Sequence, residues 1–359
     1  MKIGILTYHR SHNYGALLQA IALRHYLSLC GHDTYFIDYW PDYHKDMYKL
    51  FSRSTINELS LKRKVKYLLK RILYSYGVIK RIKLFKKFIA AHIDSFCLNT
   101  SDSFDMIVYG SDQIWRIQNS LNDFNPVYFG DHHIKTDKHV SYAASMGKLN
   151  VDNHDGNKIK SWLNKFKAIS VRESDLKSLL DSWNINDVRV VSDPTLLLSE
   201  NQWRQIINIR RIDEKYILYY DLIQDSFDNS KIKKFAKEKD LKIVELKGSI
   251  DKLLYSKNER AWEDPSGMLS LIANAEYVFT SSYHGLLFSI IFHKQVYVAF
   301  KENSGRAASI LDELGINERL IRDKSSEIPL TNIDYTIVSN KLKNLRGVSN
   351  QFISEFIRM

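Results

Sequence analysis

The sequence is poor in residues that impose covalent or metal cross-links. Among 359 residues there are two cysteines, Cys30 and Cys97, and five prolines. Two cysteines this far apart form neither a disulfide framework nor a recognised metal-ligand spacing, so we expect no metal site. No apolar run reaches the roughly 20 residues that cross a bilayer, and polar residues at 9–13 interrupt any signal-peptide core. These absences favour a cytoplasmic globular protein.

Acidic residues are missing from one long segment. Between positions 61 and 93 there are eleven basic residues and no Asp or Glu. Removing these eleven from the 52 Lys and Arg leaves 41, which equals the 41 Asp and Glu of the whole chain. The net charge of +11 therefore resides in this segment, and the rest of the protein is formally neutral.

The remaining pattern alternates strands and helices, which is typical of parallel α/β folding. We expect strands at 2–7, 34–38, 105–109, 139–143, 167–171, 188–191, 216–220, 242–246, 277–280 and 295–300. Helices are expected at 15–30, 173–183, 200–209, 230–239, 265–274, 284–292, 306–314 and 335–358. The predicted architecture is two Rossmann-like, doubly wound domains facing across a cleft. Pro194 marks the boundary, giving domains 1–195 (with the basic segment 61–93) and 196–334, and a helical tail 335–359.

The most informative motif is the junction around His284. An apolar strand at 277–280 leads through Ser281 and Ser282 to Tyr283, His284 and Gly285, after which a buried helix begins. Ligands bind at this edge of open α/β sheets, and the N-terminus of a helix attracts anions. An imidazole there can transfer a proton near neutral pH. The alternative is that His284 only caps the helix or satisfies a buried carbonyl.

Several segments, taken in order, resemble the polysaccharide pyruvyl transferase family. They are Asn-Tyr-Gly-Ala-Leu-Leu-Gln-Ala at 13–20, Tyr-Gly-Ser-Asp-Gln-Ile-Trp at 109–115, Ser-Tyr-Ala-Ala-Ser-Met-Gly at 141–147, Ser-Val-Arg-Glu-Ser at 170–174, Ser-Asp-Pro-Thr at 192–195 and the His284 segment. The resemblance implies the two-Rossmann-domain (GT-B) fold and transfer of a pyruvyl group from phosphoenolpyruvate to a sugar as a ketal. The chain departs from many relatives at Ala16, Ser281 and Tyr283, and the loss of an acidic residue at position 16 bears on acceptor handling.

The resemblance implies a donor site built on cationic strand ends. Forked guanidinium groups suit the carboxylate and phosphate of phosphoenolpyruvate. Arg172 follows the strand 167–171 and Arg306 opens the helix after 295–300. We expect Arg172 and His284 to be catalytic, and donor binding to involve Arg172, Ser282, His284, Gly285 and Arg306. Phosphoenolpyruvate is the expected donor substrate, with no cofactor. The alternatives are an ion pair of Arg172 with Glu173 or Asp175 and an ordinary helix start at Arg306.

Acceptor-binding candidates lie in the first predicted domain. They are Asn13, Tyr14, Gly15, Asp112 and Gln113, each at a turn after a strand. The competing roles are structural: Asn13 and Gly15 as turn and helix-start residues, and Ser111 or Asp112 as a helix cap. Trp115 can stack on a sugar, although a core position is more common for tryptophan. His9, His12, His132 and His133 match no metal site, and we expect them in solvated loops.

The basic segment predicts two amphipathic helices broken near Gly77. Val65, Leu68, Leu69 and Ile72 form one apolar stripe, and Val78, Ile82, Phe85 and Ile89 form another. Ordinary surface helices on the first domain are the alternative, but such helices mix charges of both signs. An anionic membrane face fits better than nucleic acid, because no nucleic-acid motif is present. The expected membrane contacts are Lys62, Arg63, Lys66, Lys70, Arg71, Lys80, Arg81, Lys83, Lys86 and Lys87.

Three functions remain open from the sequence. The first is a phosphoenolpyruvate-dependent pyruvyl transferase that acts on a bacterial surface polysaccharide or its lipid-diphosphate-linked precursor, at the inner face of the cell membrane. The second is a nucleotide-sugar-dependent glycosyltransferase, because the fold class does not fix the chemistry. The third is a membrane-associated scaffold without enzymatic activity.

Overall fold

The computed structural model describes residues 1–118, 121–147, 149, 151–222, 226–247, 263–300 and 305–358, and only the backbone of residues 153, 305 and 306. The chain divides into two compact units. The first comprises residues 1–54, 89–198 and 344–359, and the second comprises residues 55–88 and 199–343. Each unit is built on its own parallel sheet.

The first unit contains a seven-stranded sheet whose strand pairs are all parallel. Most of the strands are continuous apolar runs, which suits a sheet covered on both faces. The strand order places β5 at the centre, between β1 and β7, so the loops that follow these three strands meet at one edge. The order is β3 (Cys97–Leu98), β2 (Asp33–Ile37), β1 (Lys2–Leu6), β5 (Met106–Tyr109), β7 (His139–Ala144), β8 (Phe166–Val171) and β9 (Val188–Val190).

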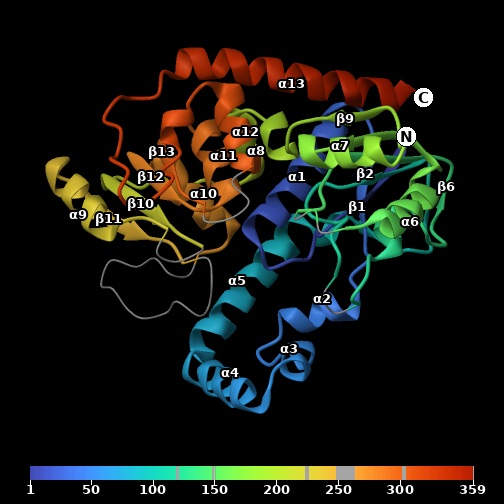
Figure 1. Cartoon of the computed structure of the whole chain (residues 1–359), viewed down its shortest axis with the longest axis horizontal. Coiled ribbons are helices and arrows are strands. Elements are labelled where there is room, and N and C mark those ends of the chain that lie inside the picture. Colours follow the sequence, from blue (N-terminus) through green and yellow to red (C-terminus); the bar gives the residue numbers. More distant parts are fainter. Residues whose placement is uncertain are drawn as a thin grey trace. The chain divides into compact units, whose positions relative to one another are not determined.

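Helices of the first unit connect these strands (Figure 1). Helix α1 (Tyr14–Leu29) is apolar and buried along its first ten residues, because it packs beside β2 and the 3-10 turn Pro194–Leu197. The others are α2 (Asp42–Met47), α6 (Asn153–Leu163) and α7 (Ser174–Ser182). The C-terminal half of α13 (Tyr335–Arg358) also belongs to this unit, where Phe352 and Phe356 are buried.

The second unit has a four-stranded parallel sheet. The order is β11 (Lys242–Glu245), β10 (Tyr216–Tyr220), β12 (Tyr277–Thr280) and β13 (Gln295–Val298). One face is filled by aromatic rings, with Phe235 edge-on to Tyr277 and Phe279 stacked on Tyr297. The helices are α8 (Glu200–Ile206), α9 (Asn229–Glu238), α10 (Pro265–Asn274), α11 (Tyr283–Ile291) and α12 (Gly305–Leu314), and Figure 1 shows α10 and α11 beside the strands.

The basic segment forms helices whose apolar faces have different environments. α3 (Arg53–Glu58) precedes α4 (Leu61–Leu73) and α5 (Ser75–His92), and the break falls at Tyr74 rather than at Gly77, which is accommodated inside α5. None of the residues of α4 is buried. In α5, by contrast, Val78, Phe85 and Ile89 are buried. The two stripes that the sequence predicts therefore have different roles.

The two-unit α/β architecture with parallel sheets agrees with the sequence prediction, and every predicted strand is present with ends shifted by at most two residues. The elements that the sequence analysis missed are short or polar: β3, β4 (Ser103–Phe104), β6 (Lys135–Thr136), α2, α3 and α6. Too few residues lie in most of these for periodicity to show. The contact-based units also differ from the expected domain limits, since residues 55–88 group with the second unit and residues 344–359 with the first.

A histidine cluster inside the first unit contains His132, for which a solvated loop was expected, and His139 of β7. The Tyr109 hydroxyl lies 2.6 Å from His132 Nε2 and 2.7 Å from His139 Nδ1. Burial lowers the pKa of both histidines to about 4, and Lys165 contributes to each shift. His9 and His12 are buried as well, whereas His133 is exposed. Of the four histidines, only His133 fits the expected solvated environment.

This cluster predicts acid sensitivity. In the unfolded chain both histidines titrate near pH 6.5, whereas in the folded protein they stay neutral down to about pH 4. The unfolded state therefore binds more protons between these values, and stability is lost as the pH falls from about 6.5 to 4. Thermal melts of the double variant His132→Gln/His139→Gln should show a smaller loss of Tm over this range than the wild type. The control His133→Gln should keep the wild-type slope, and an unchanged slope in the double variant would contradict the assignment.

Candidate functional site

The carboxyl edge of the second sheet is organised by the turn between β12 and α11. Ser282 is the N-cap of α11, and its side chain accepts a hydrogen bond from the Gly285 amide at 3.2 Å. The Ser282 amide in turn donates to Thr280 Oγ1 at 3.0 Å. His284 is consequently held in the first turn of the helix, half-buried, where the positive end of the helix dipole lies.

Gly285 is required by the close approach of Thr280. A Cβ at position 285 would lie 2.6 Å from Thr280 Oγ1 and 3.2 Å from Thr280 Cγ2. Thr280 cannot turn away freely, because its hydroxyl donates to the Tyr220 carbonyl at 2.8 Å. The Ser-Ser-Tyr-His-Gly sequence thus sets the position of His284 through a packing constraint as well as a cap.

An acidic side chain is fixed at the same edge. Asp221 follows β10 and is buried, with Ser281 Oγ donating to Asp221 Oδ1 at 2.6 Å. Ser281 Oγ also accepts from the Leu222 amide at 2.7 Å, and Ser226 donates to Asp221 from both its amide and its hydroxyl. Ser281 therefore joins the β10 and β12 strand ends through its hydroxyl.

A buried lysine at this edge escaped the sequence analysis. Lys247 lies two residues beyond β11 and is 4% exposed. Tyr219 pairs with Glu245 in the sheet, so by register Lys247 lies level with Asp221. The only sequence signal is its position after a strand, which it shares with many surface lysines. Arg306 falls in the first turn of α12, and its side chain lies outside the described part of the structure.

In the first unit a network of buried hydrogen bonds joins the strand-end turns. The Gln19 side-chain amide donates to Thr7 Oγ1 at 3.1 Å and to the Ala16 carbonyl at 2.8 Å, while its oxygen accepts from the Ser111 amide at 3.1 Å. Ser111 Oγ donates to the Ala143 carbonyl at 2.9 Å. The segments 13–20, 109–115 and 141–147 are thus linked through side chains that are shielded from solvent.

Arg172 is engaged in buried ion pairs. Its Nη1 lies 2.8 Å from Asp193 Oδ2 and its Nε lies 3.3 Å from Glu173 Oε1, and the Arg172 side chain is only 2% exposed. Asp193 also accepts from the Thr195 amide and hydroxyl. The ion pair with Glu173 that the sequence left open is present, Asp193 replaces Asp175 as the second partner, and the pairs are buried rather than on the surface. Within this arrangement Arg172 binds the Ser-Asp-Pro-Thr turn.

The acceptor candidates divide into structural and exposed groups. Asn13 is the N-cap of α1, with its Oδ1 accepting from the Ala16 amide at 3.2 Å, and Tyr14 and Gly15 are buried in the first turn. Asp112 and Gln113 are half-buried in the turn after β5, where Asp112 has a positive φ of 72°. Trp115 is a core residue: it is fully buried, stacks on Phe129 and donates to the Tyr128 carbonyl. It is therefore unavailable to a sugar.

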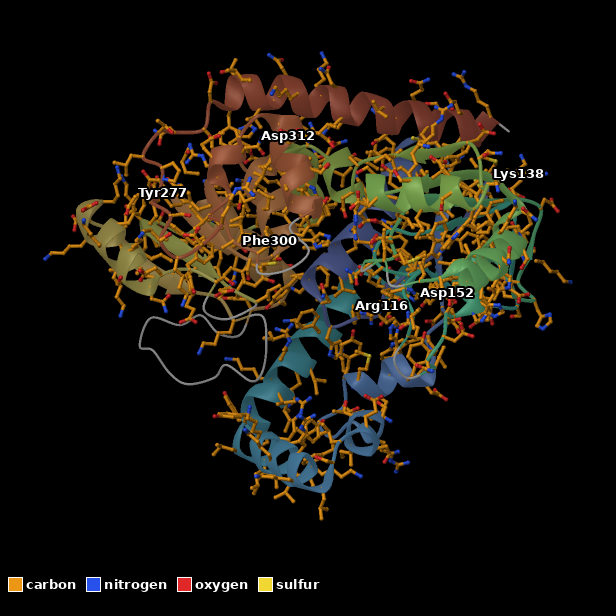
Figure 2. All side chains as sticks on the ribbon, viewed as in Figure 1. Arg116, Lys138, Asp152, Tyr277, Phe300 and Asp312 are labelled. Carbon is orange, nitrogen blue, oxygen red and sulfur yellow. The ribbon has the colours of Figure 1, made fainter. Side chains whose placement is uncertain are left out.

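An aromatic and cationic cluster adjoins the Asp112 turn. Asn125 Nδ2 donates to the hydroxyls of Tyr39 and Tyr43, at 3.0 and 2.8 Å. Burial raises the pKa of Tyr43 to about 12, so its phenol stays protonated. Arg116, labelled in Figure 2, lies close enough that its charge adds to burial in lowering the pKa of His44 to about 4. The Tyr39-Trp40 pair, which is separated from the end of β2 by one residue, was a usable sequence signal for this cluster.

Among the residues that the structure describes, one group of potential metal ligands occurs, and it lies in the first unit. Ligand atoms of His9, Asp38 and Cys97 lie within 4.8 Å of one another. Arg10 already occupies this group, since its Nε and Nη2 donate to Asp38 and its Nη2 contacts Cys97 Sγ at 3.6 Å. Burial raises the pKa of the Cys97 thiol to about 12, which disfavours the thiolate that metals bind. The group is accounted for by a charged hydrogen-bond network around Arg10.

The structure therefore brings together Ser282, His284 and Gly285, with Asp221 and Lys247 on neighbouring strands of the second unit. In the first unit it joins Asp112 and Gln113 to the aromatic cluster. Tyr8 makes this connection, because its hydroxyl donates to the Gln113 carbonyl and its ring packs edge-on against His44. Arg172 and His284 belong to different units.

Comparison with known proteins gives a family and a fold. The family model described as polysaccharide pyruvyl transferase matches residues 13–299. Among solved structures, the UDP-GlcNAc 2-epimerase from Neisseria meningitidis has a TM-score of 0.50 at 11% identity, with 100% of both chains covered. Two further solved structures align with this chain. The UDP-GlcNAc 2-epimerase from Methanocaldococcus jannaschii has a TM-score of 0.45 at 15% identity, with 100% of this chain and 99% of that chain covered. The glycosyltransferase SnogD from Streptomyces nogalater has a TM-score of 0.43 at 12% identity, with 98% of this chain and 95% of that chain covered. No curated protein matches in sequence. At these identities the structural likeness bears on the fold alone.

The Arg172–Asp193 pair predicts a large stability effect. Replacing Arg172 with Met leaves Asp193 buried without its cation, and we expect a loss of about 3–5 kcal/mol of unfolding free energy in denaturant titrations. The double variant Arg172→Met/Asp193→Asn should lose less than the sum of the single losses. The exposed pair Arg189–Glu355 provides a matched control, and Arg189→Met should cost under about 1 kcal/mol. Equal losses for the two single Arg variants would contradict the buried pairing.

The contact at Gly285 predicts intolerance of even one methyl group. Gly285→Ala should lower stability by about 1–3 kcal/mol, because the new Cβ displaces Thr280 or the first turn of α11. Gly347 in α13 serves as control, since a Cβ there meets nothing within 4 Å. Gly347→Ala should be neutral or stabilising by about 0.5–1 kcal/mol, as expected for an open helical site. Thermal and denaturant unfolding of both variants tests the difference.

Proposed function

The chain belongs to the polysaccharide pyruvyl transferase family, and we propose that it transfers a pyruvyl group from phosphoenolpyruvate to a sugar as a cyclic ketal, releasing phosphate. The observation that carries the proposal is His284 in the first turn of α11, at the carboxyl edge of the second sheet. The acceptor is proposed to be a sugar of a bacterial surface polysaccharide or of its lipid-diphosphate-linked precursor.

The donor site is proposed at the N-terminus of α11. The positive end of the helix dipole favours an anion there, and the Ser282 cap fixes the first turn in place. Lys247 is buried at the same sheet edge, level with the Asp221 carboxylate by register. Arg306 is retained as a donor-binding candidate by its position at the start of α12. Phosphoenolpyruvate, with a carboxylate and a phosphate on a small enol, fits a site of this charge.

Arg172 is not retained in the donor clamp. Its guanidinium faces two carboxylates, Glu173 and Asp193, whose combined negative charge exceeds its own. An incoming dianion would have to displace both of these partners and would meet their repulsion. We therefore propose that Arg172 is a positioning residue that holds the turn at 192–195 beneath the edge of the first sheet.

The reaction is proposed to proceed by two additions at C2 of the enol. Proton transfer to the methylene carbon forms a methyl group and an oxocarbenium-like C2, which one sugar hydroxyl attacks with loss of its proton. Phosphate then leaves with the electrons of its C–O bond, and a second hydroxyl attacks C2 with loss of its own proton and closes the ketal. His284 is proposed to supply the proton to carbon or to stabilise the departing phosphate, because an imidazole serves either purpose near neutral pH.

The acceptor is proposed to bind at the edge of the first sheet. Half-buried Asp112 and Gln113 offer a carboxylate and an amide for sugar hydroxyls, and protonated Tyr39 and Tyr43 offer donors beside them. Arg116 supplies the positive charge in this cluster, which suits a diphosphate on a lipid-linked sugar. Asn13, Tyr14 and Gly15 contribute by setting the start of α1 rather than by direct contact.

Substitution of His284 tests the proposal. His284→Ala should lower the rate of phosphate release from phosphoenolpyruvate, measured with acceptor sugars present, by about 10²–10⁴-fold. The control His293→Asn changes an exposed histidine near the other end of α11, where asparagine tolerates the positive φ of 55°. It should retain the wild-type rate. A folded His284→Ala protein with wild-type phosphate release would overturn the assignment.

The choice of donor separates this function from the alternative glycosyltransferase. Purified protein is incubated with a panel of lipid-linked and nitrophenyl sugars and either phosphoenolpyruvate or nucleotide sugars. The expected result is phosphate release and a mass gain on the sugar of one pyruvate less one water, with phosphoenolpyruvate only. Transfer from a nucleotide sugar would favour the glycosyltransferase, and consumption of neither donor would favour a non-enzymatic scaffold.

A further inference from the structure

Helix α4 exposes a continuous apolar face. Leucines, isoleucine and valine that are between half and four-fifths exposed recur at helical spacing, and the stripe continues into the first turn of α5. Residues three, four, seven or eight apart share one side of a helix, so these side chains form a single strip. Its members, with their exposed fractions, are Leu61 (79%), Val65 (51%), Leu69 (62%), Ile72 (62%), Leu73 (73%) and Tyr76 (75%).

Basic side chains surround this strip, and no acidic side chain interrupts it. Six of the thirteen residues of α4 are Lys or Arg, and none is Asp or Glu. At 100° per residue, Lys66 borders one side of the apolar strip, Lys64 and Arg71 border the other, and Lys62 lies at the N-terminal end of the strip itself. The helix therefore presents exposed aliphatic side chains between rows of positive charge.

The neighbouring helix shows that this exposure is particular to α4. Three members of the predicted stripe of α5 are buried, with Val78 and Phe85 fully enclosed and Ile89 6% exposed, and the fourth, Ile82, is half-buried. Arg81 is also buried and holds its guanidinium 4.6 Å from the Phe85 ring centroid, so it is removed from the expected membrane contacts. The apolar side chains of α5 pack mainly into the protein core, whereas those of α4 are exposed to solvent.

We propose that α4 inserts its apolar face into the interface of an anionic lipid membrane. Leucine and isoleucine enter the acyl boundary in this arrangement, and the flanking lysines meet lipid phosphates. At thirteen residues the helix is too short to span a bilayer, so it lies in the plane of the surface. No helix in the described part of the chain is long and apolar enough to cross a membrane.

Charge complementarity favours a lipid membrane over a second protein copy or nucleic acid as the partner of this helix face. A second copy of the chain would bring six more positive charges against the same strip, which is repulsive. Nucleic acid would neutralise the lysines but would leave the aliphatic strip in water, since its phosphates offer no apolar partner. A lipid surface satisfies both parts of the helix at once.

Vesicle flotation of the full chain tests the proposal. Wild-type protein should float with phosphatidylcholine vesicles that contain about one-third phosphatidylglycerol and bind vesicles of phosphatidylcholine alone at least tenfold more weakly. The variant Leu61→Gln/Leu69→Gln/Ile72→Gln/Leu73→Gln should lose at least tenfold in partitioning onto the anionic vesicles. Its fold should be unaffected, because all four side chains are exposed.

Matched controls distinguish insertion of α4 from non-specific adsorption of the protein to vesicles. Leu29→Gln/Leu330→Gln removes leucines that are 55% and 69% exposed outside the basic segment, and this variant should float like wild type. Lys62→Glu/Lys66→Glu/Lys70→Glu should abolish binding. Undiminished flotation of the four-glutamine variant would overturn insertion, and so would tight binding of duplex DNA without vesicle binding. Phosphate release measured without vesicles should be equal in all variants, so a failure of the proposed reaction is distinguishable from a failure of membrane binding.

Discussion

The side-chain amide of Gln19 is the constraint on which the edge of the first sheet depends. One residue of α1 binds the end of β1 through Thr7 and the turn after β5 through Ser111, and Ser111 extends the connection to β7. Buried polar groups of this kind cost free energy unless all are paired, so a network is stable only when it is complete. This network of hydrogen bonds positions the turn that carries Asp112 and Gln113. We assign Gln19 a structural role in that positioning.

Most of the architecture could be predicted from the sequence because parallel strands are long apolar runs separated by helices of regular period. β12, α10 and α13 begin and end where the pattern indicates. The misses have physical causes. Six-residue helices such as α2 show less than two full turns of periodicity, and the basic segment gives no signal for which of its apolar stripes is covered. Whether an apolar stripe is buried depends on contacts with residues far away in the sequence, and a local pattern does not show these contacts.

The turn that carries Ser282, His284 and Gly285 was predictable, because a buried strand and a buried helix flank it in the sequence. Side-chain contacts were not predictable where the partner is far away in sequence. Arg172 follows its strand as a donor-site arginine would, yet Asp193, twenty-one residues later, fixes its guanidinium in the interior. The sequence around Lys247 and Tyr43 has no pattern that distinguishes these two residues from ordinary surface residues. The family resemblance therefore places these residues at strand ends, and only the structure shows which partners their side chains have.

The two halves of α13 belong to different units, and this has a consequence for biosynthesis. Ser349 is fully buried in the first unit, where its hydroxyl accepts from the Ser192 amide across 157 residues of chain. Tyr26 donates to Asn350 in the same region. During translation, the first unit is therefore begun early but completed late, because it needs residues 344–359. Part of the apolar surface of its strands stays uncovered until the final turns of α13 leave the ribosomal exit tunnel. Chaperone dependence during translation would be concentrated in this interval.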